Sequence, residues 1–477
     1  MRRAMLLAAM GVFALAAVSP AGAATYEVGP DKALKSVGDV PWEKLAAGDT
    51  VLIYWRAEGY KEKFGIFAEG RADAPVTVKG VPGPNGELPV LDGNGATTRK
   101  ESNYWNSDRS VIKIGGTNTP PENPMPTYIV IENLDVRGAR PPYTFTTFKG
   151  EAKTYGASAS AIHVERGEHI TVRNCRLHDS ANGFFVSSTD SAASKDILVE
   201  GNYIYDNGLD KSVYQHNNYT AAIGITFQFN RFGPLREGCS GNNLKDRSAG
   251  LVVRYNWLEG GNRQLDLVDG EDSRLIREDP AYRATFVYGN ILIEPENAGN
   301  SQIAHYGGDS RNTPNYRKGT LYFYNNTVVS TRTDRTTLFR LSTNDESCDA
   351  RNNILYAAAA DGKTLSLIDG AGRLTMTHNW LKSGYVKCFE TPEGEAADDG
   401  TSVTGAAPGF VDEARQDFRL ARGSPCIDAG TALAAAALPA NNVVMEYEKH
   451  RKGGARPADM KLDIGAYEFV AGAESRR

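Results

Sequence analysis

Three charged residues in a row interrupt a stretch that is otherwise apolar or amide-rich. Lys245, Asp246 and Arg247 lie between Leu244 and Ser248. Side chains of a strand alternate between two faces, which puts Leu244, Asp246 and Ser248 together. Because leucine favours the interior, the two cations are expected to project outward, where they pack little and are candidate catalytic residues. Asp246 is then buried and needs a hydrogen-bonded or charged partner. Two outward cations are also typical of an ordinary solvated surface.

A run of carboxylates follows Lys245 at about one repeat length. Leu265 and Leu267 are expected to point inward, so Asp266 between them points outward. Since 21 residues separate Lys245 from Asp266, the two side chains are expected to stack side by side. Asp266 is therefore a candidate substrate-binding residue.

The end of this run could bind a metal ion. Asp269, Glu271 and Asp272 continue into a turn, and calcium prefers oxygen ligands of this kind. A plain acidic turn explains the same residues without a metal. Asp269 is in addition a candidate for contact with substrate. Calcium is the one cofactor that the sequence suggests.

The repeat before Lys245 supplies a histidine and a tyrosine. His216 and Tyr219 can each act as a general acid or base, and tyrosine also stacks on sugar rings. Counted in repeats, both fall beside Lys245 and Arg247, so they complete the set of catalytic candidates. The remaining candidates for substrate contact are Asn217, Arg254 and His305.

These residues belong to a repeat that closes on asparagine. Short runs of alternating apolar residues recur 26 to 41 residues apart, and the intervals hold further strand-like pieces. Such spacing favours a solenoid whose coils of short strands stack about 4.8 Å apart. Asparagine suits the bend because it tolerates left-handed dihedral angles, and stacked asparagines form an amide ladder. The repeated residues are Asn133, Asn174, Asn202, Asn230, Asn256, Asn290, Asn326, Asn353 and Asn379.

This pattern, together with the segments 48–51, 75–78 and 463–468, resembles right-handed parallel β-helix carbohydrate-active proteins. More narrowly, it is similar to the chondroitinase B-like and alginate lyase-like polysaccharide lyases. The resemblance covers most of the chain and implies an all-β, right-handed parallel β-helix with a capping segment at each end. The same fold also hosts hydrolases, epimerases, esterases and adhesins, so it specifies the activity less closely than the architecture.

The resemblance implies β-elimination at a uronic acid, in which a base removes the proton beside the carboxylate and cations neutralise the developing charge. Lys245 matches the position of the family's catalytic lysine. The family's catalytic arginine belongs to an Arg-His-Gly run about one coil later, where this chain has Val268-Asp269-Gly270. Either Arg247 takes over the charge role, or Asp266 and Asp269 serve as the carboxylate pair of a glycoside hydrolase.

Four segments are expected along the chain. Residues 1–23 are typical of a secretory signal peptide, with Arg2 and Arg3 ahead of an apolar stretch and a small-residue cleavage site. Residues 24–127 are expected to form a β-rich cap with an insertion, 128–395 the coils that carry the site, and 396–477 a C-terminal cap whose acidic residues are structural. No later run is apolar and long enough to span a membrane.

Composition limits the partners. The formal net charge is −5 and no block of Lys or Arg stands out, which disfavours a nucleic-acid partner. The five cysteines are widely spaced, so one or two disulfides could form after export, while Cys175 within a strand repeat favours a buried thiol.

The sequence therefore predicts an exported, monomeric, periplasmic or secreted polysaccharide lyase acting on an anionic, uronic-acid-containing polysaccharide. A glycoside hydrolase on the same scaffold is one alternative. A non-catalytic β-helix that binds polysaccharide is the other.

Overall fold

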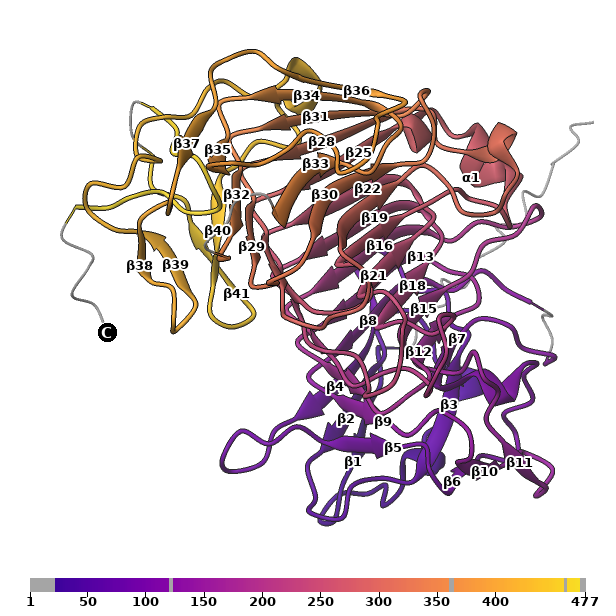
Figure 1. The fold of residues 1–477 in the computed structure, drawn as a ribbon. Helices are drawn as coiled ribbons and strands as arrows, with labels where there is room; N and C mark the ends of the chain where they lie inside the picture. The colour runs from indigo at the N-terminus through magenta and orange to yellow at the C-terminus, as the bar shows by residue number, and fades with distance from the viewer. Residues whose placement is uncertain (1–21, 120–122, 360–363, 459–460, 472–477) are drawn as a thin grey trace, which may run out of the picture.

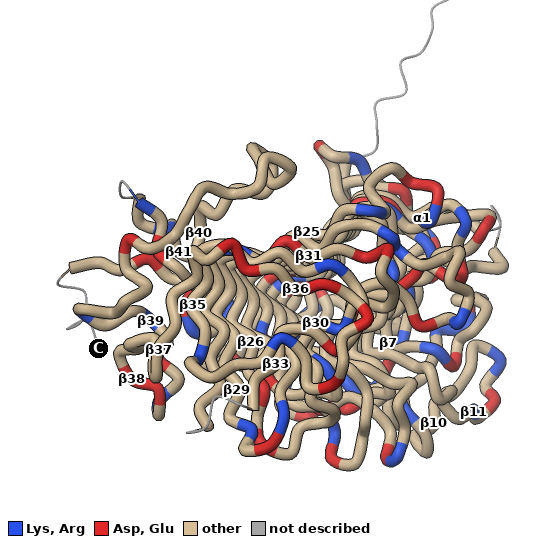
Figure 2. Tube along the Cα trace, turned by 45° about the horizontal axis from the view of Figure 1, so that its top comes forward, with Lys and Arg blue, Asp and Glu red and all other residues tan. Residues whose placement is uncertain are grey.

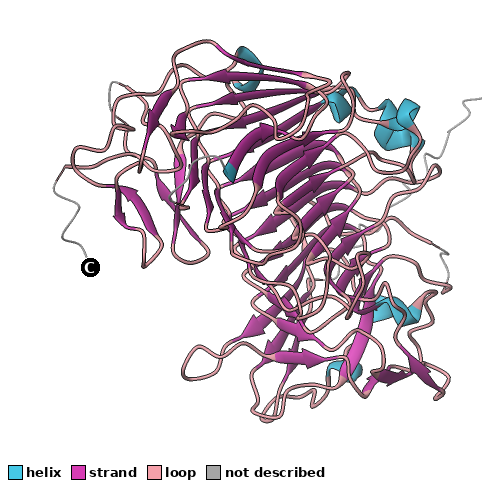
Figure 3. Cartoon of the chain, in the orientation of Figure 1, coloured by secondary structure: helices cyan, strands magenta, loops and turns pink. Residues whose placement is uncertain are grey.

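The chain winds into a parallel β-helix, as predicted (Figure 1). The computed structural model describes residues 22–119, 123–359, 364–458 and 461–471, so the predicted signal peptide lies almost wholly outside the described residues. Between residues 168 and 368, each coil contributes one strand to each of three long sheets, in the order first sheet, third sheet, second sheet. The described helices are short and lie outside the coils (Figure 3), and none is long and apolar enough to cross a membrane.

The first sheet has 13 strands: β1 (Thr25–Val28), β2 (Thr50–Tyr54), β4 (Val76–Val81), β8 (Thr127–Glu132), β13 (Glu168–Arg173), β16 (Lys195–Glu200), β19 (Ile223–Gln228), β22 (Ala249–Arg254), β25 (Ala284–Tyr288), β28 (Thr320–Tyr324), β31 (Ser347–Arg351), β34 (Arg373–Thr377) and β36 (Glu395–Asp398). The second sheet also has 13: β11 (Ala152–Thr154), β10 (Thr144–Thr146), β6 (Ala96–Thr98), β3 (Glu62–Ile66), β7 (Ser110–Ile114), β12 (Ser160–Val164), β15 (Asn182–Val186), β18 (Asn218–Thr220), β21 (Leu244–Asp246), β24 (Leu265–Leu267), β27 (Gln302–Tyr306), β30 (Thr336–Leu341) and β33 (Leu365–Ile368). The third sheet has 11: β5 (Val90–Asp92), β9 (Asp135–Arg137), β14 (Arg176–His178), β17 (Tyr203–Ile204), β20 (Arg231–Phe232), β23 (Trp257–Glu259), β26 (Ile291–Glu294), β29 (Thr327–Ser330), β32 (Ile354–Ala357), β35 (Trp380–Lys382) and β37 (Val403–Gly405).

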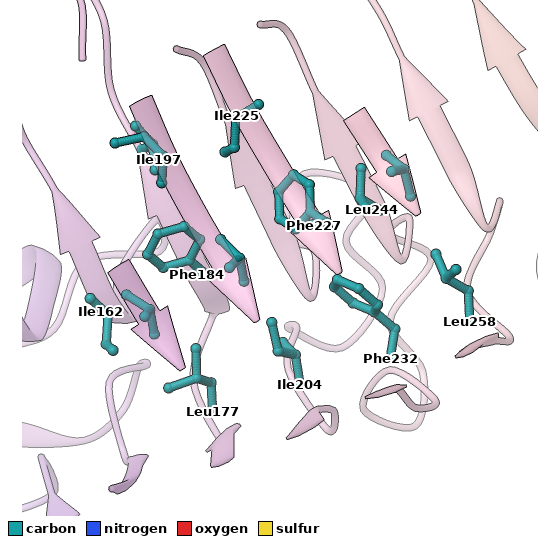
Figure 4. Packing of buried hydrophobic residues seen from close by; sticks show 14 of the residues in the cluster. Ile162, Leu177, Phe184, Ile197, Ile204, Ile225, Phe227, Phe232, Leu244 and Leu258 are labelled. Atoms are coloured by element: carbon teal, nitrogen blue, oxygen red, sulfur yellow. The ribbon is translucent and has the colours of Figure 1, made fainter. Parts of the chain in front are cut away.

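The core is a column of apolar side chains inside the coils (Figure 4). Each strand turns alternate residues inward, and the parallel register stacks each inward residue on its equivalent in the next coil. Phe227 of β19, Ile204 of β17 and Phe184 of β15, one from each sheet, are fully buried in this column. Because every coil buries its own inward residues, the outward residues are free to differ from coil to coil and to form a site.

An asparagine ladder fixes the bend between the first and third sheets. From Asn202 to Asn353, each side-chain amide donates to the Oδ1 of the next asparagine at 2.9–3.1 Å, and each Oδ1 in the ladder also accepts a backbone N–H. All the members are fully buried, so the ladder satisfies polar groups that would otherwise be stranded at the turn. Its members are Asn202, Asn230, Asn256, Asn290, Asn326, Asn353 and Asn379.

Two predicted members, Asn133 and Asn174, belong to the neighbouring position instead. Both have left-handed backbones, with φ of 59° and 55°. In the coil of Asn174, the ladder position is held by the next residue, Cys175, whose backbone N–H donates to Asn202 Oδ1 at 2.9 Å. The residue just before each ladder asparagine is the left-handed one, as at Tyr255 with φ of 54°. Asparagine therefore recurs at two adjacent positions of this bend, the left-handed residue and the ladder residue after it. The sequence pattern did not distinguish the two positions.

Replacing Asn290 by alanine is expected to lower the free energy of unfolding by about 2–5 kcal/mol. The change removes donors to Asn326 Oδ1, Val253 O and Tyr288 O and strands the Asn256 N–H. Thermal and denaturant unfolding would measure the loss. The exposed Asn85 is the matched control, and its replacement by alanine should change stability by less than about 0.5 kcal/mol.

The coils begin earlier than the predicted boundary at residue 128. β1, β2 and β4 from segment 24–127 pair in parallel and continue directly into β8. Strands β10 and β11, which follow that boundary at residues 144–154, extend the second sheet from β6 of the N-terminal segment. The N-terminal segment is therefore the first part of the solenoid as well as its cover.

The C-terminal segment packs along the side of the solenoid. It contains the hairpins β38 (Phe410–Asp412) with β39 (Asp417–Leu420) and β40 (Met445–Glu448) with β41 (Lys452–Ala455), which lie beside the third sheet (Figure 1). Phe418 stacks on Trp257 of β23 and Tyr447 packs against it at a tilt, with ring centroids 5.7 and 6.0 Å away. The buried Arg456–Glu468 pair at 2.6 Å fits the predicted structural role of the terminal acidic residues.

All five cysteines lie within the described ranges, and each is a free thiol there. Cys175 is completely buried, and burial raises its pKa to about 12. The sequence-based prediction of a buried thiol at this position is confirmed.

Candidate functional site

Five successive strands of the second sheet present one row of outward side chains. The register pairs Tyr219 of β18 with Lys245 of β21, Lys245 with Asp266 of β24, Asp266 with His305 of β27, and His305 with Arg340 of β30. The predicted stacking of Asp266 beside Lys245 is therefore correct. One polar residue per coil accumulates on this face because the inward partners already fill the core.

The inward face of β21 is also as predicted. Leu244, Asp246 and Ser248 are fully buried, and Arg317 Nη2 reaches Asp246 Oδ1 at 3.5 Å. Thr220 and Ser248 donate their hydroxyls to the same carboxylate at 2.6 and 2.8 Å. Burial raises the pKa of Asp246, and Arg317 opposes the rise. The role of Asp246 is thus a structural ion pair behind the site.

A cavity of about 420 Å³ opens over the polar row. It is bordered by loops before and after the strands, and Tyr214 stands 79 % exposed at its rim. Acidic and basic residues are interspersed along the loops on the right of Figure 2, without a block of one sign. The cavity is lined by Val213, Tyr214, His216, Tyr219, Asn242, Lys245, Arg247, Asn262, Arg263, Asp266, Glu271, His305, Asp309 and Arg340.

Lys245 is held between two carboxylates. Its Nζ contacts Asp266 Oδ2 at 2.9 Å and also Asp309 Oδ2. Burial alone would lower the pKa of Lys245, but Asp266 and Asp309 raise it above the usual value. Lys245 is only 6 % exposed, so the expectation that an outward lysine packs little is wrong. The loop that carries Asp309 covers it.

Arg247, two residues after Lys245, belongs to the same network of ion pairs. It donates from Nη2 to Asp309 Oδ1 at 2.9 Å and to Glu271 Oε1 at 2.7 Å. Its Nε donates to the Tyr219 hydroxyl oxygen at 2.7 Å. Because Tyr219 accepts that bond, its own O–H proton is left to point elsewhere. Burial raises the pKa of Tyr219, which keeps the hydroxyl protonated.

His216 is fixed as a hydrogen-bond donor rather than a base. Its Nδ1 accepts the backbone N–H of Asn242 at 2.9 Å. Burial, reinforced by Lys245, lowers the pKa of His216 to about 3, so the ring is neutral at ordinary pH. A neutral imidazole whose Nδ1 accepts carries its proton on Nε2.

Asp266 is the hub of the network. Its Oδ1 lies 2.8 Å from His305 Nδ1, and its Oδ2 accepts from Lys245 and, at 2.7 Å, from the Asn242 side chain. Burial opposes ionisation, yet Lys245 and His305 hold the pKa of Asp266 well below its usual range. The carboxylate is therefore ionised and orients both of its cross-strand neighbours.

Three predicted site residues lie elsewhere. Asn217 is fully buried in a second amide ladder, with Nδ2 donating to Asn243 Oδ1 at 2.7 Å. Arg254 is on the first sheet, where it contacts Gln228 and Tyr288. Asp269 is completely buried, and its carboxylate accepts the Asp309 backbone N–H at 2.9 Å. It anchors the covering loop and does not line the cavity.

The acidic turn is largely committed to protein contacts. Glu271 pairs with Arg247, Asp269 holds the loop, and Asp272 is exposed. Within the described ranges, no three His, Cys, Asp or Glu side chains are grouped so that they could hold a metal ion. The three calcium candidates therefore do not converge on one point.

Several lining residues were not predicted. Asp309 follows the pair Gly307-Gly308, a turn signal next to the predicted His305, and this signal could have drawn attention to it. Arg263 and Arg340 had no signal, since a lone arginine on a strand face is ordinary. Asn242 was concealed within an amide-rich run.

Comparisons with known proteins support the fold. No protein-family model and no curated protein sequence matches the chain. Among solved structures, a pectate lyase, Pel9A, is 12 % identical over 93 % of this chain and 96 % of its own, with a TM-score of 0.50. An alginate lyase from Paenibacillus sp. str. FPU-7 is 14 % identical over 70 % of this chain and 92 % of its own, with a TM-score of 0.45. A GH136 lacto-N-biosidase from Eubacterium ramulus is 12 % identical over 80 % and 68 %, with a TM-score of 0.41.

These neighbours include polysaccharide lyases and a glycoside hydrolase. Of the three, the pectate lyase supports the architecture, and its 12 % identity is too low to carry more. The chain thus resembles the parallel β-helix carbohydrate-active proteins, as its sequence predicted.

Proposed function

We propose that this protein is an exported polysaccharide lyase that cleaves a uronic-acid-containing polysaccharide by β-elimination. The observation that carries the proposal is the placement of Lys245, Arg247 and Tyr219 around one cavity, with Arg247 hydrogen-bonded to the tyrosine. The β-helix fold is compatible with this chemistry, and the leader-like residues 1–23 support export to the periplasm or beyond.

Each residue has a defined task in the proposed reaction. Lys245, in its neutral form, takes the proton next to the substrate carboxylate. The electron pair forms the new C=C bond as the glycosidic C–O bond breaks, and the Tyr219 hydroxyl gives its proton to the leaving oxygen. Arg247 and the fixed Nε2–H of His216 hydrogen-bond the charge that develops on the carboxylate.

Charge balance sets a condition on substrate binding. Lys245 and Arg247 are each paired with Asp309 and with a second carboxylate, Asp266 for the lysine and Glu271 for the arginine. A substrate carboxylate that binds between these two cations is therefore expected to displace one of these acids. Asp309 fits that role because it bridges both cations and its side chain remains 33 % exposed. The exposed Tyr214 at the rim offers a ring for sugar stacking.

The first experiment is an ultraviolet absorbance assay on a panel of uronic-acid polysaccharides, with and without chelator. A rise from an unsaturated uronate product is the expected result. New reducing ends without that absorbance would instead favour a hydrolase. The pair Asp266 and Asp269 is then unsuitable, because Asp269 is turned away from the cavity, and Asp266 with Asp309 would be tested in its place. If neither assay gave a signal with any member of the panel, the proposal that this protein cleaves these glycans would be wrong.

A further inference from the structure

An aspartate, a histidine and a serine form a continuous series of hydrogen bonds. Asp266 and His305 line the cavity, and the series ends at Ser342, two residues after the lining residue Arg340. Ser342 Oγ lies 2.9 Å from His305 Nε2, and His305 Nδ1 lies 2.8 Å from Asp266 Oδ1. The three residues come from three consecutive coils, since β24, β27 and β30 pair in order. The proposed lyase chemistry makes no use of Ser342 or of the second ring nitrogen of His305.

The positions of the protons between Asp266, His305 and Ser342 follow from the negative charge of Asp266. Asp266 is an anion, so a lone pair on His305 Nδ1 facing it at 2.8 Å would be repelled, and Nδ1 must carry the proton. Burial lowers the pKa of His305, with Asp266 opposing, so the ring is neutral and Nε2 holds a lone pair. At 2.9 Å that lone pair is placed to accept the Ser342 O–H proton. The carbonyl oxygens of Gly308, at 3.0 Å, and Tyr306, at 3.3 Å, compete for the same proton.

The backbone is shaped to bring the serine to the histidine. Gly307 has a φ of 133°, and a Cβ there would stand 2.5 Å from Ser342 Oγ, so a side chain at this position would expel the hydroxyl. Ser342 itself is half-buried just after β30, two residues beyond Arg340, which lines the cavity. Ser342 is thus placed as a nucleophile next to a base, His305, which the Asp266 carboxylate orients. This is the arrangement that activates a serine.

We propose that Ser342, His305 and Asp266 form a catalytic triad that hydrolyses carboxylic esters on the hydroxyl groups of a bound glycan. Ser342 Oγ bonds to the ester carbonyl carbon while its proton passes to His305 Nε2. The bond from that carbon to the sugar oxygen then breaks, and the sugar oxygen takes the proton. Water hydrolyses the acyl-serine through the same histidine and releases the carboxylic acid. The Gly308 N–H already donates to Ser342 Oγ at 2.9 Å, so the oxyanion donor that we assign is the Arg340 guanidinium, which lines the cavity two residues before Ser342.

A fluorophosphonate probe tests the nucleophile directly on the full-length protein. The expected result is covalent labelling that peptide mapping places on Ser342 and that is absent from Ser342→Ala. The exposed Ser191 is the internal control, since a surface serine without a base should remain unlabelled. Absence of label on Ser342 in the folded wild-type protein would overturn the proposal.

Ester turnover tests the activity. Acetate release from p-nitrophenyl acetate and from glucose pentaacetate is expected to fall at least about 1,000-fold in Ser342→Ala and in His305→Ala. Thermal unfolding checks that each variant is folded. Persisting turnover in a folded Ser342→Ala would refute the triad. Neither probe contains a uronic acid, so this test can succeed or fail independently of the proposed lyase activity.

Discussion

Replacing Lys245 by arginine is expected to reduce unsaturated-product formation at least about 100-fold while preserving the fold. An arginine keeps the positive charge between Asp266 and Asp309, which are both ionised partners of Lys245. A guanidinium does not lose its proton in a protein, so it cannot serve as the base. The ultraviolet assay measures the activity and thermal unfolding measures the stability, with a change of only a few degrees expected.

Two further variants separate catalysis from stability. Lys113 occupies the same outward row four coils earlier and pairs with Glu165 at 2.8 Å, so Lys113→Arg is a matched control that should retain activity. Lys245→Met should lose activity and also destabilise the protein by about 3–5 kcal/mol, because it leaves the buried Asp266 carboxylate without its lysine partner. If Lys245→Arg kept wild-type turnover, Lys245 would be a structural cation only.

The sequence alone predicted how the site strands present their side chains. Alternation along Leu244 to Ser248 identified the inward and outward faces correctly. In a strand that buries a leucine, the residues on either side of that leucine must point outward. The spacing to Asp266 gave the cross-strand neighbour, since parallel coils repeat their register. Both inferences rely on local periodicity, which is the physical content of a solenoid.

Residues brought in by loops could not be predicted in the same way. Asp309 reaches Lys245 and Arg247 through the turn after β27, and its position depends on Asp269, 40 residues earlier. Asp269, within the run that matches the family's Arg-His-Gly, suggested changed chemistry, whereas its carboxylate is used to anchor that loop. The same limit applies to the C-terminal segment. Its contacts with Trp257 join residues about 160 to 190 positions apart, and no periodic pattern encodes them.

Replacing Asp309 by asparagine is expected to strengthen binding of an anionic glycan on the order of tenfold, about 1.4 kcal/mol. The change removes the internal carboxylate that occupies the position between Lys245 and Arg247. Both cations keep another partner, Asp266 for the lysine and Glu271 for the arginine, so the loss of stability should be small. Binding can be measured by calorimetry, and KM by the ultraviolet assay.

The same variant should shift the pH profile in a direction fixed by charge. Burial lowers the pKa of Lys245, while Asp266 and Asp309 raise it, so wild-type kcat/KM is expected to climb toward alkaline pH as the free lysine loses its proton. Without the Asp309 charge the pKa falls, and the rising limb moves to lower pH. Asp272→Asn makes the same change in net charge at an exposed position and should move neither the limb nor KM. An Asp309→Asn variant with weaker binding and an unmoved limb would show instead that Asp309 itself holds the substrate.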